Sequence, residues 1–129
     1  MAPLLKVEDL HIGFGPLEPL AGVDVSVDRG RILGLVGESG SGKSMTAMSI
    51  MGLLPLMGGR IKSGRIVFDG TDLSSISEKA YRQLRGGRIA LITQNPMTSL
   101  DPVVTVGRQI DQVAELHLGL PRKAARDNT

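Results

Sequence analysis

The residues with the clearest chemical potential lie together in one short, glycine-rich segment. Residues 37–44 read Gly-Glu-Ser-Gly-Ser-Gly-Lys-Ser, which matches the pattern G-x-x-x-x-G-K-[ST] in full. Small residues at Gly40 and Gly42 let the backbone wrap around a phosphate, so that successive N–H groups point at it. Lys43 brings a compact cation to the phosphate oxygens, and the Ser44 hydroxyl suits one ligand position on Mg²⁺. The segment therefore predicts binding of a purine nucleoside triphosphate together with Mg²⁺.

A glycine-rich turn can match this pattern by chance, and the neighbouring elements distinguish the two interpretations. A phosphate-binding loop needs a strand before it and a helix after it. Ile32–Val36 is apolar on both faces, which is typical of a buried central strand. From Ser44 toward Pro55, apolar residues recur at helical spacing. This context favours phosphate binding. The residues predicted to contact the nucleotide here are Gly37, Glu38, Ser39, Gly40, Ser41, Gly42, Lys43 and Ser44, with the Glu38 side chain directed to solvent.

The rest of the chain predicts strands and helices that position this loop on a parallel sheet, an α/β fold. Alternating Val23, Val25 and Val27 indicate a strand with one wet face. The other predicted strands are an edge strand at Leu4–Leu10, a strand at Arg65–Phe68 closed by a turn at Asp69-Gly70, and a buried strand at Arg88–Thr93. Loops are predicted at Leu56–Gly64 and Asn95–Pro102. The predicted helices are one at Ser77–Leu84 capped by Ser77, one capped by Thr105 that carries Val106, Ile110 and Val113, and a helical turn at Arg122–Arg126.

The composition excludes several classes of function. The 129 residues include no cysteine, which removes disulfides and thiolate chemistry. One Tyr, two Phe, no Trp and a net charge of +2 argue against a nucleic-acid platform. Residues 1–6 do not begin a signal peptide, and the apolar stretch Ser49–Met57 is too short to cross a bilayer. Met45, Met48, Met51 and Met57 are expected to pack in the core and not to bind metal.

A second and more specific pattern follows the predicted strand at residue 88. Residues 88–102 read Arg-Ile-Ala-Leu-Ile-Thr-Gln-Asn-Pro-Met-Thr-Ser-Leu-Asp-Pro. Together with Val23–Ser44 and Arg65–Gly70, this stretch resembles the ATP-binding subunits of ABC transporters. Its Pro-Met-Thr-Ser-Leu-Asp-Pro run is similar to the importers of dipeptides, oligopeptides and nickel. The resemblance covers essentially the whole chain and implies the P-loop NTPase fold of an ABC-type nucleotide-binding domain, in its N-terminal part. Roughly residues 1–94 would form the nucleotide-binding core, and residues 95–129 the Q-loop and the start of the helical subdomain.

The resemblance also implies roles for individual residues. Phe14 would stack on adenine, although a lone Phe near a strand end is otherwise a core residue. Gln94 would be the Q-loop glutamine, whose amide reaches Mg²⁺ and the attacking water, and that role comes from the resemblance alone. Asn95–Pro102 would dock the membrane subunits. A second ATPase subunit would complete a homo- or heterodimer at the cytoplasmic face of the inner membrane.

Several motifs of the family do not occur in these 129 residues. They lack the Leu-Ser-Gly-Gly-Gln signature, the Walker B strand, the carboxylate that serves as general base, and the switch histidine. His11 and His117 are in the wrong places for the last role. We therefore expect the N-terminal half of a subunit that energises peptide or nickel import, in which Lys43 stabilises phosphoryl charge but no base activates water. The alternatives are a nucleotide-binding module without turnover, or an ABC-type ATPase with no transport role.

Overall fold

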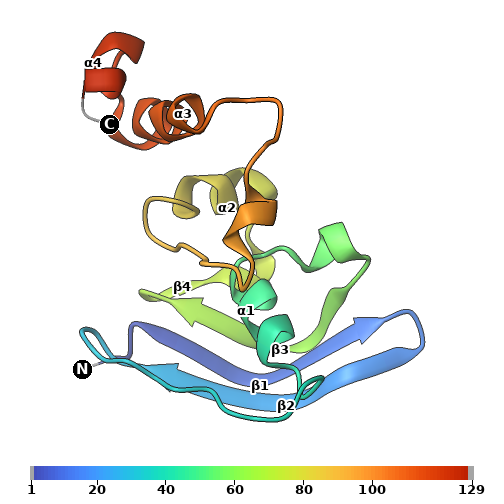
Figure 1. Ribbon diagram of the computed structural model, residues 1–129. Coiled ribbons are helices and arrows are strands. Elements are labelled where there is room, and N and C mark those ends of the chain that lie inside the picture. Colours follow the sequence, from blue (N-terminus) through green and yellow to red (C-terminus); the bar gives the residue numbers. More distant parts are fainter. Residues whose placement is uncertain (1, 128–129) are drawn as a thin grey trace. The chain divides into compact units, whose positions relative to one another are not determined.

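A computed structural model describes residues 2–127 and separates the chain into two units, with the boundary between Arg82 and Gln83. Figure 1 shows the strands and α1 in the first unit, and α3 and α4 in the second. The predicted division near residue 94 separates functional segments and stays a prediction. The elements are β1 (Leu5–Phe14), β2 (Leu17–Val27), α1 (Lys43–Ile50), η1 (Leu54–Met57), β3 (Arg60–Phe68), β4 (Thr71–Asp72), η2 (Leu73–Ser75), α2 (Glu78–Leu84), η3 (Pro96–Ser99), α3 (Val106–Leu118) and α4 (Arg122–Asp127).

The sheet of the first unit is antiparallel, with the strand order β2-β1-β3-β4. β1 therefore lies inside the sheet, and the prediction of an edge strand at residues 4–10 was wrong. The alternation in β2 is confirmed, because Val23, Val25 and Val27 are half-buried between exposed neighbours. The turn at residues 69–70 between β3 and β4 is also confirmed. Within residues 2–127 the named strands pair only antiparallel, so the expected parallel sheet is not formed by this part of the chain.

The core is built on the inner face of β1, where the direction of the side chains changes at a β-bulge. Val7, Leu10 and Ile12 are all buried, although strict alternation from Val7 would bury residues 9 and 11 instead. The pairing of β1 shifts register here toward both β2 and β3. Asp9 adopts the left-handed region with φ 44°. The bulge rotates the following residues of the strand, and this turns Leu10 and Ile12 toward the core.

The bulge requires a close approach between the backbones of β1 and β3. Gly64 of β3 has φ +84°, and a Cβ atom at this position would overlap the carbonyl oxygen of Asp9. Both facts restrict position 64 to glycine, because an L-residue is strained at this φ and the colliding atom belongs to the backbone. The missing side chain at Gly64 is therefore what permits the register change on β1.

Two segments predicted as buried strands have no strand partner among residues 2–127. Ile32–Val36 forms no ladder, and the Ile32 and Val36 side chains are 100% and 93% exposed. In the segment Arg88–Thr93 only Ile89 forms an isolated bridge, to Arg85, and Ile92 is 91% exposed. Both predictions of a buried strand are wrong for this structure. An apolar composition does not supply the neighbouring strand that a buried strand needs for its hydrogen bonds.

Three helices predicted from caps and periodicity are confirmed. The Ser77 hydroxyl accepts a hydrogen bond of 3.3 Å from Ala80 N at the start of α2. Thr105 Oγ1 accepts one of 3.4 Å from Arg108 N at the start of α3. The predicted helical turn at residues 122–126 becomes α4. In each case the residues that define the helix lie within a few positions of one another, which is why the sequence alone was sufficient.

Other boundaries differ from the prediction. α1 ends at Ile50, before the predicted limit near Pro55, and a separate 3₁₀ turn, η1, follows it. β3 begins at Arg60, inside the predicted loop at residues 56–64, and η3 lies inside the predicted loop at residues 95–102. Among the four methionines assigned to the core, only Met51 is buried.

The buried positions of α1 are polar. Thr46 and Ser49 are 4% and 1% exposed. Each hydroxyl donates to the carbonyl oxygen four residues earlier, Thr46 to Gly42 at 2.9 Å and Ser49 to Met45 at 2.7 Å. Because these bonds satisfy the hydroxyls within the helix, Thr46 and Ser49 occupy the inward face at little cost. A periodicity of apolar residues could not indicate this arrangement.

A charged cluster crosses the sheet on β1, β2 and β3. His11 Nδ1 lies 2.6 Å from Glu18 Oε1, and His11 Nε2 lies 3.1 Å from Asp9 Oδ1. Lys62 Nζ donates to the other oxygen of Glu18 at 2.7 Å. The hydrogen bond with Glu18, followed by that with Asp9, raises the pKa of His11 above 6.5. The pKa is raised because the protonated ring can donate to both carboxylates at once.

We expect the pKa of His11, followed by NMR titration of its ring, to lie above 6.5. Because the folded-state pKa is raised, the stabilisation by protonated His11 is complete below pH 6.5 and is lost as the pH rises through the folded-state value. Glu18→Gln removes the first cause of the shift and should lower the measured pKa. An unchanged pKa in Glu18→Gln would contradict the role given to this contact.

We expect Gly64→Ala to destabilise the protein by about 2 kcal/mol or more, since it adds backbone strain and a steric overlap with Asp9. Gly70→Ala is the matched control: Gly70 has a similar φ of +78°, but a Cβ there meets nothing within 4 Å. The control should show the conformational cost alone, about 1 kcal/mol. Urea unfolding of the two variants measures the difference, and equal losses would show that the close approach at the bulge is unimportant.

Candidate functional site

The predicted phosphate-binding loop lies between the unpaired segment at residues 32–36 and α1. Its backbone turns through Gly40 and Gly42, which have φ of +82° and +92°. Ser41 N donates to Glu38 O at 3.2 Å and closes the turn. The loop residues Gly37–Ser41 are exposed, so a ligand can approach the backbone. The glycines at positions 40 and 42 thus adopt backbone conformations that other residues rarely adopt, and phosphate binding by the loop stays a prediction.

No side chain of α1 competes with an anion for the N–H groups of its first turn. Its N-cap residue is Gly42, no side chain caps the helix, and no acidic residue lies in the first turn. The N–H groups at a helix start carry partial positive charge and need acceptors. An anion such as a phosphate supplies those acceptors. The start of α1 thus fits the phosphate-binding role.

The Lys43 side chain lies across the loop. Its ammonium group donates to the carbonyl oxygens of Gly37 and Glu38 at 2.7 and 2.6 Å, and contacts Ser41 Oγ at 3.2 Å. These three oxygens bring the cation to the inside of the loop, where the backbone turns. Phosphate oxygens are stronger acceptors for an ammonium group than neutral carbonyls are. Lys43 is therefore held where it can exchange loop oxygens for those of a phosphate.

A close contact with the sheet supports the loop. A Cβ atom on Gly42 would overlap Cδ1 of Leu20, and Leu20 is only 4% exposed on β2. Leu20 in turn pairs with Ile12 of β1. Gly42 is therefore needed for two reasons, its positive φ and the proximity of Leu20. The sequence carries no signal for this contact, because Leu20 is one apolar residue among many.

The chemistry of the loop also fits a hydrated Mg²⁺ ion carried by a nucleotide. Ser44 is exposed in the first turn of α1, and its hydroxyl makes no hydrogen bond to the described part of the chain. A hydroxyl oxygen is the hard type of ligand that Mg²⁺ prefers. Within residues 2–127, no group of three or more His, Asp or Glu side chains could hold a metal ion. Any Mg²⁺ here would depend on the phosphates for most of its ligands.

The two remaining predicted site residues lie outside the loop. Phe14 ends β1 and is half-buried, with its ring against the backbone of Gly59, where a Cβ would lie 2.6 Å from Cζ. Gln94 is exposed and belongs to the second unit. The structure thus groups Gly37–Ser44 in one place, and the assignments of Phe14 and Gln94 to the nucleotide stay predictions.

Comparison with known proteins agrees with these features. A family model described as "ABC transporter" matches residues 20–128. The oligopeptide transport ATP-binding protein AppD of Bacillus subtilis is 44% identical over 98% of this chain and 40% of that protein. The probable peptide ABC transporter ATP-binding protein y4tR of Sinorhizobium fredii is 47% identical over 95% of this chain and 38% of its own length. The chain therefore spans about 40% of the length of such relatives.

Solved structures give the same picture of the fold. The structure of cbiO1 from Clostridium perfringens, part of an ABC transporter complex, matches 98% of this chain and 47% of that chain. Its TM-score is 0.71 at 25% identity. A structure titled as the ATP binding subunit of an ABC transporter has a TM-score of 0.68 and 30% identity, over 92% of this chain and 44% of that chain. Within residues 2–127, no helix is long and apolar enough to span a membrane.

The phosphate-binding loop, the helix start behind it and the similarity along almost the whole sequence all agree. The family model matches most of the chain, and the matched structures share its fold. The fold is therefore that of part of an ABC ATPase domain, and the chain belongs to the ABC transporter family.

Proposed function

We propose that the 129-residue chain is the N-terminal half of an ATP-binding subunit and that it binds Mg·ATP. The observation that carries the proposal is the loop at residues 37–42, which brings the Lys43 ammonium to its centre and ends at an uncapped helix start. The backbone N–H groups and Lys43 bind the phosphates. Ser44 and Gln94 would hold Mg²⁺, which neutralises phosphate charge when bound. Phe14 would stack on the adenine.

For the whole subunit we propose ATP hydrolysis coupled to import of peptides. Relatives whose names describe oligopeptide and dipeptide transport match this chain at 44% and 42% identity, which supports peptides as the class of substrate. The exposed segment Asn95–Pro102 would dock membrane subunits at the inner face of the membrane. A second ATPase subunit would complete the nucleotide site, as a homo- or heterodimer.

The unpaired apolar segments support the proposal of a longer subunit. Ile32–Val36 leads directly into the phosphate loop, and its backbone groups have no ladder partner within residues 2–127. A central strand next to a phosphate loop is ordinarily buried between parallel neighbours. We propose that strands outside these 129 residues pair with this segment and shield it.

For the 129-residue chain alone, we expect Mg·ATP binding that depends on Lys43. Lys43→Ala removes a charge-assisted contact to phosphate, which should weaken equilibrium binding by about 10- to 150-fold. Lys79→Ala, on the exposed side of α2, is the matched control and should bind as the unaltered chain does. Calorimetric titration with Mg·ATP measures all three proteins. If Lys43→Ala bound Mg·ATP as tightly as the unaltered chain, the assignment of the loop as the nucleotide site would be wrong.

We further expect the 129-residue chain to release phosphate from ATP no faster than its Lys43→Ala variant does. The family's general base does not occur in this sequence, so the bound water is not activated. A sensitive colorimetric assay of phosphate, run at saturating Mg·ATP, tests this expectation. Binding without turnover also agrees with the alternative of a nucleotide-binding module. Turnover clearly above the Lys43→Ala background would show that a catalytic base lies among these residues.

A further inference from the structure

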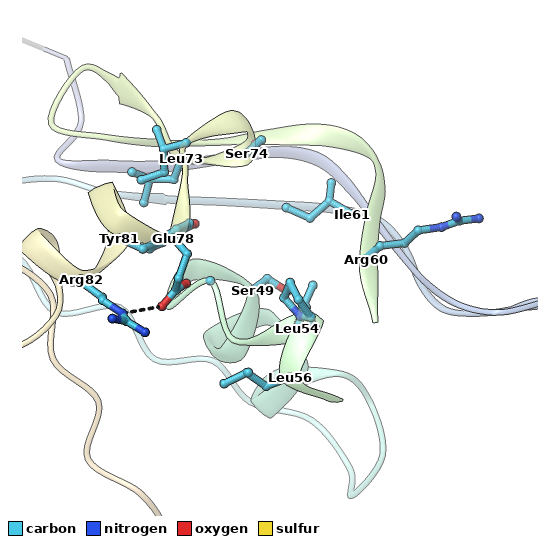
Figure 2. A pocket seen from close by; sticks show the side chains of 13 residues that line it. Ser49, Leu54, Leu56, Arg60, Ile61, Leu73, Ser74, Glu78, Tyr81 and Arg82 are labelled. Atoms are coloured by element: carbon cyan, nitrogen blue, oxygen red, sulfur yellow. Dashed lines mark ion pairs between the residues drawn. The ribbon is translucent and has the colours of Figure 1, made fainter. Parts of the chain in front are cut away.

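The first unit contains a pocket that shares no residue with the phosphate loop. Its volume is about 540 Å³, and it lies among the C-terminal part of α1, η1, β3, η2 and α2 (Figure 2). A volume between about 300 and 1,000 Å³ is typical of sites for small molecules. Its lining residues are Ser49, Gly52, Leu54, Pro55, Leu56 and Arg60, with Ile61, Leu73, Ser74, Ile76, Glu78, Tyr81 and Arg82. The nucleotide role proposed above leaves this pocket unused.

The inner wall of the pocket is apolar and firmly packed. Leu54, Leu73 and Tyr81 are 2%, 1% and 7% exposed. The Tyr81 ring lies against the backbone of Gly52, where a Cβ would come within 2.5 Å of the ring. The apolar surface that a ligand can still cover belongs to Leu56, which is 83% exposed, and to the half-buried Ile61 and Ile76. Contact with these side chains would remove apolar surface from water, which favours a ligand with an aliphatic or aromatic body.

The hydroxyl groups of the wall already have partners. Ser49 Oγ donates to Met45 O at 2.7 Å, and Ser74 Oγ accepts from Ile66 N at 2.8 Å. Hydroxyls that are satisfied in this way do not demand polar atoms from a ligand. The strongest polar contacts available to a ligand are those of the charged side chains at the rim.

The charged groups at one rim are Glu78 and Arg82 of α2. Figure 2 shows both beside Tyr81, whereas Arg60 lies across the pocket and extends away from it. Arg82 Nε is 3.5 Å from Glu78 Oε1, and the Arg82 side chain is 78% exposed. No hydrogen bond to the described residues uses the Nη atoms of Arg82. A guanidinium group can bind two carboxylates, one through Nε and one as a bidentate pair through its outer nitrogens.

We propose that this pocket binds a small carboxylate with an apolar body. The body packs against Leu56, Ile61 and Ile76, and the carboxylate accepts hydrogen bonds from the outer nitrogens of Arg82. Organic acids and apolar amino acids share this chemistry. Apolar amino acids differ from the corresponding organic acids by an ammonium group, which would face the Glu78 side of the rim.

The test uses three probes of similar shape with the complete 129-residue chain. 3-Phenylpropanoate carries the carboxylate, L-phenylalanine adds an ammonium group, and 3-phenylpropan-1-ol replaces the carboxylate by a neutral group. Titration followed by two-dimensional NMR should give a dissociation constant on the order of millimolar for 3-phenylpropanoate, as its size allows. The alcohol should bind at least about 10-fold more weakly. Tighter binding of L-phenylalanine would identify amino acids as the source, and weaker binding would identify organic acids.

Variants and the location of the NMR shifts make the result specific. Arg82→Gln should weaken 3-phenylpropanoate binding by about 10-fold, while Lys79→Gln, a charge on the same helix outside the pocket lining, should leave it unchanged. Both positions are exposed, so both variants should fold. Shifts should gather at Ser49, Gly52 and Leu73. Equal binding of the alcohol, unchanged binding in Arg82→Gln, or shifts centred on the exposed segment 32–36 would each overturn the proposal.

Discussion

The close approach of Gly64 to Asp9 is the constraint on which the first unit depends. It allows the β-bulge at Asp9 of β1. The bulge turns the Leu10 and Ile12 side chains toward the core, to the side on which Val7 lies. Contacts between neighbouring residues connect this part of β1 to the phosphate loop. Ile12 pairs with Leu20 on β2, and Leu20 touches Gly42 at the start of α1. The loop is thus positioned from the antiparallel sheet, although the strand-like segment that precedes it has no partner in residues 2–127.

The start of α1 shows how binding and stability are balanced locally. An uncapped helix start leaves N–H groups without acceptors, which costs stability until an anion arrives. Thr46 does not relieve this cost, because its hydroxyl and its N–H both donate to the carbonyl oxygen of Gly42 at 2.9 Å, so the N–H groups of the first turn stay available to an anion. The same residue fills a buried position next to the loop. A side-chain cap at position 42 would give a more stable helix, but it would occupy the groups that a phosphate needs.

The features that the sequence could predict are those encoded within a few residues. The phosphate loop, the caps at Ser77 and Thr105 and the turn at residues 69–70 all belong to this kind. The bulge at Asp9 could not be predicted, because it depends on a glycine 55 positions later on another strand. The exposure of Ile32 likewise depends on which strands lie beside it, and the pocket behind α1 depends on five elements meeting. Residue types indicate which structures a segment can form, whereas its pairing with segments distant in the sequence decides which of them it forms.

The two sites of the first unit lie at opposite ends of one short helix. Lys43 begins α1 at the phosphate loop, and Ser49, near its C-terminal end, lines the pocket. Eight residues of helix span about 12 Å. The Thr46 and Ser49 hydroxyls both bond to the preceding turn within this span. If a ligand in the pocket alters nucleotide affinity, linkage requires the nucleotide to alter the ligand's affinity by the same factor. α1 is the element through which that coupling would pass, because it is the one helix that contributes residues to both sites within the described part of the first unit.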